Sequence, residues 1–174
     1  MNKKLSSRTI ALLALLVAIN LILNFFLRLP TPTGFISLVE VGIFLSAWYL
    51  GPHAGMIVGG LTGFLIDLLV GYPQWMFFSL LIHGCEGYLF GLNLKKIAGR
   101  FQWLISALLG GIVMVSGYLL AGLCLQFLNH AVVQTAFLST LTEIPGNIIQ
   151  VIAGGIVARL IYQPFCRFMN RITK

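Results

Sequence analysis

Six apolar segments divide the chain, and short interruptions rich in polar residues, glycine or proline separate them. The segments cover residues 9–29, 37–50, 54–70, 74–94, 103–128 and 137–162. A helix needs about 20 mostly apolar residues to cross a bilayer, so the pattern predicts six membrane-spanning helices. Segments 37–50 and 54–70 are short, and we expect them to tilt, to break or to be shielded by neighbouring helices.

Proline and glycine mark the turns between these segments, as in the stretches 30–34, 51–52 and 71–73. No long polar stretch or charge block interrupts the pattern. We therefore expect one domain over residues 1–174. Its fold class is an all-α membrane protein, a single bundle of six transmembrane helices.

The composition excludes a soluble domain, because 59% of the residues are hydrophobic and only 9% are charged. The net charge of +7 raises the question of a nucleic-acid partner. The basic residues, however, flank the apolar segments, which is typical of topology signals beside anionic lipid. The expected surroundings are a lipid bilayer, and no nucleic-acid partner is expected.

The basic residues also orient the bundle. Six crossings place ten of the eleven Lys and Arg residues on one side and leave only Arg28 on the other. Because cytoplasmic loops carry the excess of Lys and Arg, both termini are expected in the cytoplasm. The basic start of the chain resembles a signal peptide, but its long apolar run favours a retained first helix.

All four acidic residues, Glu40, Asp67, Glu86 and Glu143, lie inside or at the edge of apolar segments. A carboxylate at the centre of a bilayer costs about 2.5–3.5 kcal/mol on the insertion scale, so such residues usually line a cavity or have a partner. Four of them in so short a chain indicate a small-molecule site. Glu40 and Asp67 lie near the outer ends of their segments, where a pocket wall, a loop anchor and a partner for Arg28 all stay open.

Two polar stripes carry the candidate chemistry. His83 and Glu86 share one face of the fourth segment with Ser79, and the stripe fits either a pocket wall or a structural pair. The second stripe, in the last segment, consists of Glu143, Asn147 and Gln150. Polar groups in lipid need partners or water, which favours a pocket for this stripe.

Pro145 and Gly146 stand inside the second stripe, and we expect them to kink the last helix. Aromatic residues gather at the outer loops, among them Phe35, Tyr72 and Trp75. They fit an interfacial aromatic belt, and they equally fit contact with a flat ring ligand at the mouth of a pocket.

Missing motifs limit the function. The chain contains no G-x-x-x-x-G-K-[ST], no H-E-x-x-H, no G-x-S-x-G and no acidic pair with metal-ligand spacing in one helix. We therefore expect neither an enzyme nor a metal site, and no cofactor in this chain. Its cysteines form no C-x-x-C pair.

Small residues repeat at four-residue spacing in two segments. Gly55, Gly59 and Gly63 favour close packing inside the bundle, because small residues let helices approach. In the first segment Ala11, Ala14 and Ala18 share one face. That face fits packing within the bundle or docking of another membrane protein.

Together these features resemble the substrate-binding S components of energy-coupling factor (ECF) vitamin transporters. The run from residues 34–43 through 71–78 to 83–84 is most similar to the hydroxymethylpyrimidine/pyridoxine type. The resemblance implies vitamin uptake across a bacterial cell membrane with a T component and two ABC-type ATPases, which use the ATP. It also implies docking of the T component on Ala14 and Ala18, and ligand contacts from Glu86 and Asn147.

The charge of the expected pocket bears on the substrate. Carboxylates, His83 and amides surround it, and Arg28 is the only nearby cation. Such a site favours a neutral or cationic ring, such as hydroxymethylpyrimidine, pyridoxine or thiamine, over a carboxylate such as pantothenate or folate. Alternatives are an S component for another vitamin, an intramembrane enzyme using His83 and Glu86 as acid and base, and an assembly protein without a ligand.

Overall fold

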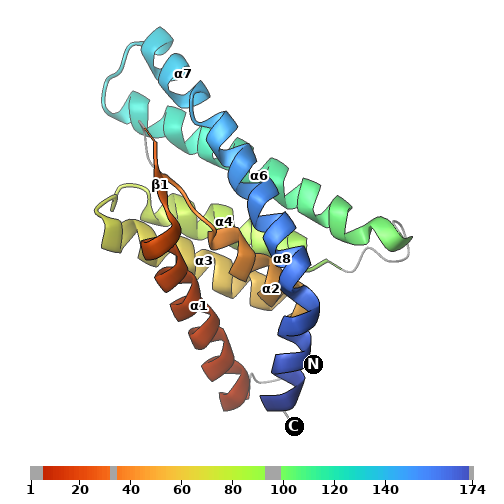
Figure 1. Cartoon of the computed structure of the whole chain (residues 1–174). Coiled ribbons are helices and arrows are strands. Elements are labelled where there is room, and N and C mark those ends of the chain that lie inside the picture. The colour runs from red at the N-terminus through yellow and green to blue at the C-terminus, as the bar shows by residue number, and fades with distance from the viewer. Residues whose placement is uncertain (1–5, 32–34, 93–98, 173–174) are drawn as a thin grey trace.

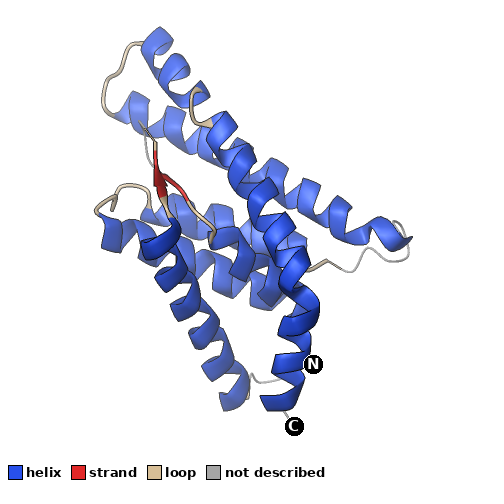
Figure 2. Cartoon of the chain, in the orientation of Figure 1, coloured by secondary structure: helices blue, strands red, loops and turns tan. Residues whose placement is uncertain are grey.

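A computed structural model describes residues 6–31, 35–92 and 99–172, and almost all of this part is helical (Figures 1 and 2). Each expected apolar segment contains a helix. The elements are α1 (Ser7–Leu27), β1 (Leu29–Pro30), β2 (Phe35–Ile36), α2 (Val39–Leu50), α3 (Pro52–Val70), α4 (Met76–Phe90), η1 (Gly99–Phe101), α6 (Gln102–Leu128), α7 (Val133–Leu141) and α8 (Ile144–Ile172).

Helix lengths correct the expectation of which segments are short. Of the described helices, α1, α3 and α6 and the stretch 133–171 are long and apolar enough to cross a membrane. The short apolar helices are α2, with 12 residues, and α4, with 15. The prediction was right for α2 and wrong for α3, which has 19 residues because the helix already begins at Pro52. Proline is favoured in the first turn of a helix.

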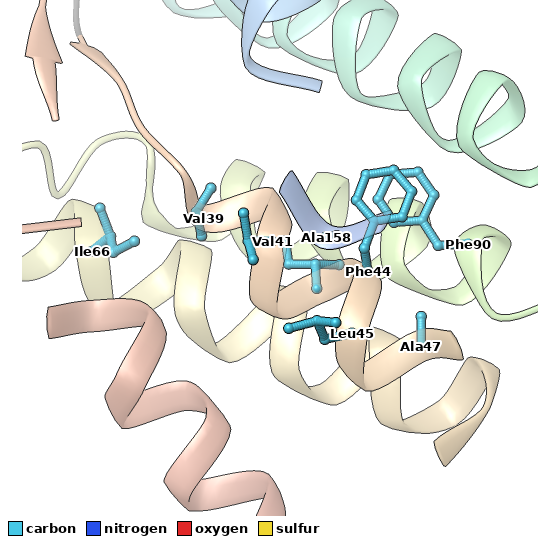
Figure 3. Packing of buried hydrophobic residues seen from close by; sticks show 9 residues of the cluster. Val39, Val41, Phe44, Leu45, Ala47, Ile66, Phe90 and Ala158 are labelled. Atoms are coloured by element: carbon cyan, nitrogen blue, oxygen red, sulfur yellow. The ribbon is translucent and has the colours of Figure 1, made fainter. Parts of the chain in front are cut away.

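The short helix α2 lies at the centre of the fold and contacts α1, α3, α4 and α8. Every residue from Val39 to Ala47 is buried. Figure 3 shows its side chains packed with Ile66 of α3, Phe90 of α4 and Ala158 of α8. The rings of Phe44 and Phe90 stack with centroids 3.7 Å apart. Its neighbours therefore shield α2 from lipid, although at about 1.5 Å per residue it is too short to span a bilayer.

A two-stranded hairpin replaces part of the loop expected at residues 30–37. Strands β1 and β2 are antiparallel, with Leu29 opposite Ile36 and Pro30 opposite Phe35. Proline has no backbone N–H, so it fits only an edge position of this kind. Strand β2 also contacts α8, and the hairpin therefore brings Phe35 and Ile36 to the N-terminal end of the last helix.

The last apolar segment is not one kinked helix. It divides into α7 and α8, with Thr142 and Glu143 between them, so the prediction of a continuous helix over 137–162 was wrong. Pro145 does not kink the interior of a helix. It lies in the first turn of α8, where a backbone N–H has no acceptor within the helix, so the missing N–H of proline costs no hydrogen bond. Helix α8 then continues through Pro164 to Ile172.

The two ends of the molecule differ. The start of α1 and the end of α8 lie at one end, and the hairpin and the α6–α7 turn lie at the other (Figure 1). This arrangement agrees with an even number of crossings. On α1, Ala11, Ala14 and Ala18 are all exposed, so the packing of this face inside the bundle finds no support in the described residues.

The glycines of α3 pack inside the bundle as predicted. A Cβ atom at Gly55 would overlap the carbonyl oxygen of Gly87, and one at Gly59 would overlap that of His83. At Gly63 it would lie 2.9 Å from the carbonyl oxygen of Ser79. The backbones of α3 and α4 are therefore in direct contact. This contact fixes α3 against the face of α4 that carries Ser79 and His83.

We expect Gly59→Ala to lower stability, because the added methyl group meets backbone that cannot rotate away. Overpacking of this kind costs about 1–3 kcal/mol. Gly84→Ala is the matched control, since a Cβ atom there would meet its nearest neighbour at an ordinary 3.6 Å. Thermal unfolding in detergent should show a lower midpoint for Gly59→Ala only. Equal midpoints in the two variants would contradict the close α3–α4 contact.

Candidate functional site

A cavity of about 310 Å³ opens at the end of the molecule that carries the hairpin. Six elements, β2, α2, α3, α4, α6 and α8, and the loops beside them form its walls. The lining consists of Thr31, Phe35, Ile36, Ser37, Val39, Gly63, Ile66, Asp67, Tyr72, Trp75, His83, Tyr118, Thr142, Glu143, Gly146, Asn147, Ile149 and Gln150. The size suits a small molecule.

Most of the residues expected to bind a substrate line this one cavity. They are Phe35, Tyr72, Trp75, His83, Glu143, Asn147 and Gln150. The other two, Glu40 and Glu86, are fully buried behind the wall and are not part of the lining. Contact between any of these side chains and a ligand stays a prediction.

His83 connects the cavity to the buried acids. Its Nδ1 atom lies 2.7 Å from Glu86 Oε2, and its Nε2 atom lies 3.0 Å from the hydroxyl of Tyr118. That hydroxyl lies 2.7 Å from Ser79 Oγ. Each ring nitrogen of His83 thus has one partner, with the donor and acceptor roles set by the tautomer of the ring. The imidazole is therefore held on both sides.

Gln150 connects the hairpin to the same acids. Its amide nitrogen donates to Glu40 Oε1 at 3.0 Å, and its amide oxygen accepts from the backbone N–H of Ser37 at 2.8 Å. Ser37 directly follows β2. The orientation of Gln150 is thus fixed by both of its ends, because each end of the amide has one partner of the right kind.

Four aromatic rings line the cavity. The ring centroids of Phe35 and Tyr72 are 6.3 Å apart, and those of Trp75 and Tyr118 are 5.9 Å apart. All four side chains line the cavity, whereas the neighbouring Phe77 is 60% exposed on the outer surface. The placement of Phe35, Tyr72 and Trp75 favours a ring-binding role over an interfacial belt.

The cavity is acidic at its wall and behind it. Asp67, whose role the sequence left open, lines the cavity together with Glu143. Among the residues that the structure describes, no Lys or Arg lines it. Arg28 makes no ion pair within 4.0 Å in that part of the chain, and its guanidinium lies over the ring of Phe25 at 5.8 Å. The idea that Arg28 pairs with Glu40 or Asp67 is therefore not supported.

Sequence reasoning missed Tyr118, which lies on α6 and lines the cavity. A tyrosine in an apolar span is a weak signal, because tyrosines also face lipid near the interface. Its role follows only from the packing of α6 against α4, which places its hydroxyl group between Ser79 and His83.

The family model for the ECF-type riboflavin transporter, S component, matches residues 4–166 of this chain. The chain belongs to the S components of ECF-type transporters. It is 34% identical over 163 residues to the thiamine precursor transporter HmpT of Lactococcus lactis subsp. cremoris (strain MG1363). That alignment covers 92% of this chain and 87% of the relative.

Two further comparisons agree with this family. An uncharacterised protein of Pyrococcus woesei, described only as lying in the gap 3' region, is 33% identical over 75% of this chain and 82% of its own length. A solved S component of a bacterial ECF transporter has the same fold, with a TM-score of 0.70. That match is 23% identical in sequence and covers 92% of this chain and 96% of the other.

The family confirms the resemblance seen in the sequence. The chain is the membrane-embedded, substrate-binding subunit of an ECF-type transporter, and its family consists of transporter components and not of enzymes. The cavity at the hairpin end is the candidate substrate site of that subunit. The alternative of an intramembrane enzyme that uses His83 and Glu86 as acid and base finds no support in this family.

Trp75 should report on occupation of this cavity. It lines the cavity, whereas Trp48 and Trp103 line a separate cavity elsewhere in the molecule. A bound ring changes the surroundings of Trp75 alone, so substrate should alter the tryptophan fluorescence and Trp75→Phe should abolish most of that change. Trp103→Phe is the control and should keep it. A full signal in Trp75→Phe would contradict the placement of the substrate.

Proposed function

We propose that this chain captures the thiamine precursor hydroxymethylpyrimidine, or a closely related neutral or cationic ring, from outside the cell. It would deliver the ring through a T component and two ABC-type ATPases. The proposal rests first on the acidic cavity, which no described Lys or Arg lines. The identity to a thiamine precursor transporter supports it.

The cavity offers acceptors to a ligand that carries N–H and O–H groups. The carboxylates of Asp67 and Glu143 face it from α3 and from the α7–α8 turn, and the amides of Asn147 and Gln150 face it from the first turns of α8. The amino and hydroxymethyl groups of a pyrimidine donate hydrogen bonds to such acceptors. A carboxylate vitamin would meet like charges at low dielectric, which costs affinity.

The ring itself would lie among aromatic side chains. Phe35 and Tyr72 come from the hairpin and the α3–α4 turn, and Trp75 precedes the first turn of α4. A flat ligand ring stacks favourably on aromatic side chains of this kind. Pyridoxine shares the ring and the hydroxyl groups, and it is the second candidate on the same chemistry.

The transport step requires an exposed surface for the T component. We assign it to the face of α1 that carries Ala11, Ala14 and Ala18, all of which are exposed. Small side chains permit close approach of another helix. Arg8 near the start of α1, and Arg167 and Arg171 near the end of α8, lie at the end of the molecule opposite the hairpin. Such basic residues favour placing that end in the cytoplasm, which leaves the cavity open to the outside.

Asn147→Ala should weaken binding of hydroxymethylpyrimidine by about 1–3 kcal/mol, the scale of a buried hydrogen bond that loses one partner. Gln163→Ala is the control, because Gln163 lies on the same helix but lines the other cavity. Isothermal titration of the detergent-purified chain measures both. Full affinity in a folded Asn147→Ala would remove this residue from the site.

The same titration with a panel of vitamins tests the proposed function itself. Hydroxymethylpyrimidine or pyridoxine should bind tightly without turnover, and pantothenate and folate should not bind. Tight binding of riboflavin would instead show that the substrate is the vitamin named in the family model and not the thiamine precursor transported by HmpT. Chemical conversion of any of these ligands would contradict the proposal that the chain only binds its substrate.

Binding and transport should separate at α1. Ala18→Trp adds a bulky side chain to the proposed docking face and leaves the cavity untouched, so ligand affinity should stay normal while uptake and copurification with a T component fail. Leu120→Trp is the control, since Leu120 is 66% exposed on α6. Normal uptake by Ala18→Trp would show that this face meets only lipid.

A further inference from the structure

We propose that Glu40, His83 and Glu86 bind a divalent transition-metal cation behind the vitamin cavity. Glu40 comes from α2, and the other two residues come from α4. Each offers one ligand atom, and these atoms all lie within 4.8 Å of one another. The inference goes beyond the proposed function and does not depend on which vitamin is bound.

Two oxygen atoms in this cluster lack a partner. Glu40 Oε2 and Glu86 Oε1 are buried and receive no hydrogen bond from a hydroxyl, amide or imidazole group. Both side chains are completely shielded from solvent, and the two carboxyl groups lie next to each other. A buried carboxylate oxygen without a donor is costly, because the oxygen has lost water and gained nothing. A cation between the two carboxylates supplies the missing interaction for both.

The interatomic distances suit ligands of one ion. His83 Nδ1 lies 2.7 Å from Glu86 Oε2 and 3.6 Å from Glu40 Oε1. Ligand atoms that each bind a metal at about 2.0–2.2 Å are at most about 4.4 Å apart. Both separations from His83 fall below that limit, and the ligand atoms of all three residues lie within 4.8 Å of one another, so small side-chain shifts would bring the three residues to one ion.

The surroundings resemble the outer shell of a metal site. Tyr118 holds the second ring nitrogen of His83, and Gln150 holds Glu40. Such partners usually orient the ligands of a metal. When a metal binds Nδ1, the proton of the imidazole is on Nε2, which donates a hydrogen bond to the Tyr118 hydroxyl. That hydroxyl then donates a hydrogen bond to Ser79. The hydroxyl groups of Tyr118 and Ser79 allow this direction of the hydrogen bonds, because each both donates and accepts.

Charge favours a dication. The groups that face the cluster are Ser79 and Tyr118 through His83, and Gln150 through Glu40. In the described part of the chain no Lys or Arg nitrogen lies within 4.0 Å of either carboxylate. Two carboxylates neutralise one M²⁺ ion. An imidazole nitrogen in the set favours zinc, iron, nickel or copper over magnesium, calcium or manganese, which prefer oxygen ligands.

His83 also gives the ion a route. Its side chain lines the vitamin cavity and simultaneously contacts Glu86. An ion can therefore enter through the cavity. Sequence spacing within one helix does not reveal this set, because α2 and α4 each contribute only part of it.

Metal titration of the intact chain tests the proposal. The protein is purified in detergent without a polyhistidine tag, stripped with a chelator and titrated with Co²⁺, whose visible absorption reports nitrogen and oxygen ligands, and then with competing Zn²⁺. We expect one ion per chain. Glu40→Gln and Glu86→Gln should each weaken binding at least tenfold. His53→Gln, which changes an exposed histidine outside the cluster, should bind normally.

The wild-type result alone can overturn the proposal, so it stays testable if the glutamine variants fail to fold. Absence of Co²⁺ and Zn²⁺ binding by the wild-type chain would mean that the carboxylates hold a proton instead. Equal affinity in a folded Glu86→Gln would also overturn it. Vitamin titration of the same samples separates the two claims: vitamin binding without metal contradicts only this inference, and metal binding without any vitamin contradicts only the proposed function.

Discussion

Backbone contact between α3 and α4 is the constraint on which the candidate site depends. Gly55, Gly59 and Gly63 allow the two helices to touch at Gly87, His83 and Ser79, which repeat at the same four-residue spacing. Any larger residue in the glycine stripe would push α4 away from α3. The contact therefore fixes the height and rotation of His83, and through His83 it fixes the wall of the cavity.

Burial of acids around α2 gives this wall its chemistry. The helix is too short to span a bilayer, and its neighbours enclose it, so Glu40 meets the side chains of α4 and α8 and not lipid. Gln150 joins Glu40 to the backbone N–H that follows β2. One network thus connects the hairpin at the cavity mouth with the buried carboxylates. An excess of acceptors in this network is the physical reason for proposing a substrate ring that donates hydrogen bonds.

The sequence predicted the helices and the polar stripes well, because apolar runs and helical periodicity are local signals. It placed Asn147, Gln150 and Glu143 on one wall, and the structure brings all three to one cavity. It did not predict that Glu86 lies behind His83, because the side-chain depth of a residue depends on which helices pack around it. The hairpin, the break between α7 and α8 and the role of Tyr118 also depend on contacts between distant segments, which periodicity does not report.

The acidic cavity at the hairpin end should hold a vitamin ring that carries no carboxylate. Mass spectrometry can identify the small molecules that copurify with the wild-type chain from cells grown in complete medium. We expect about one molecule per chain of a hydroxymethyl-substituted pyrimidine or pyridine. Retention of a carboxylate vitamin such as pantothenate, at the same stoichiometry, would contradict it.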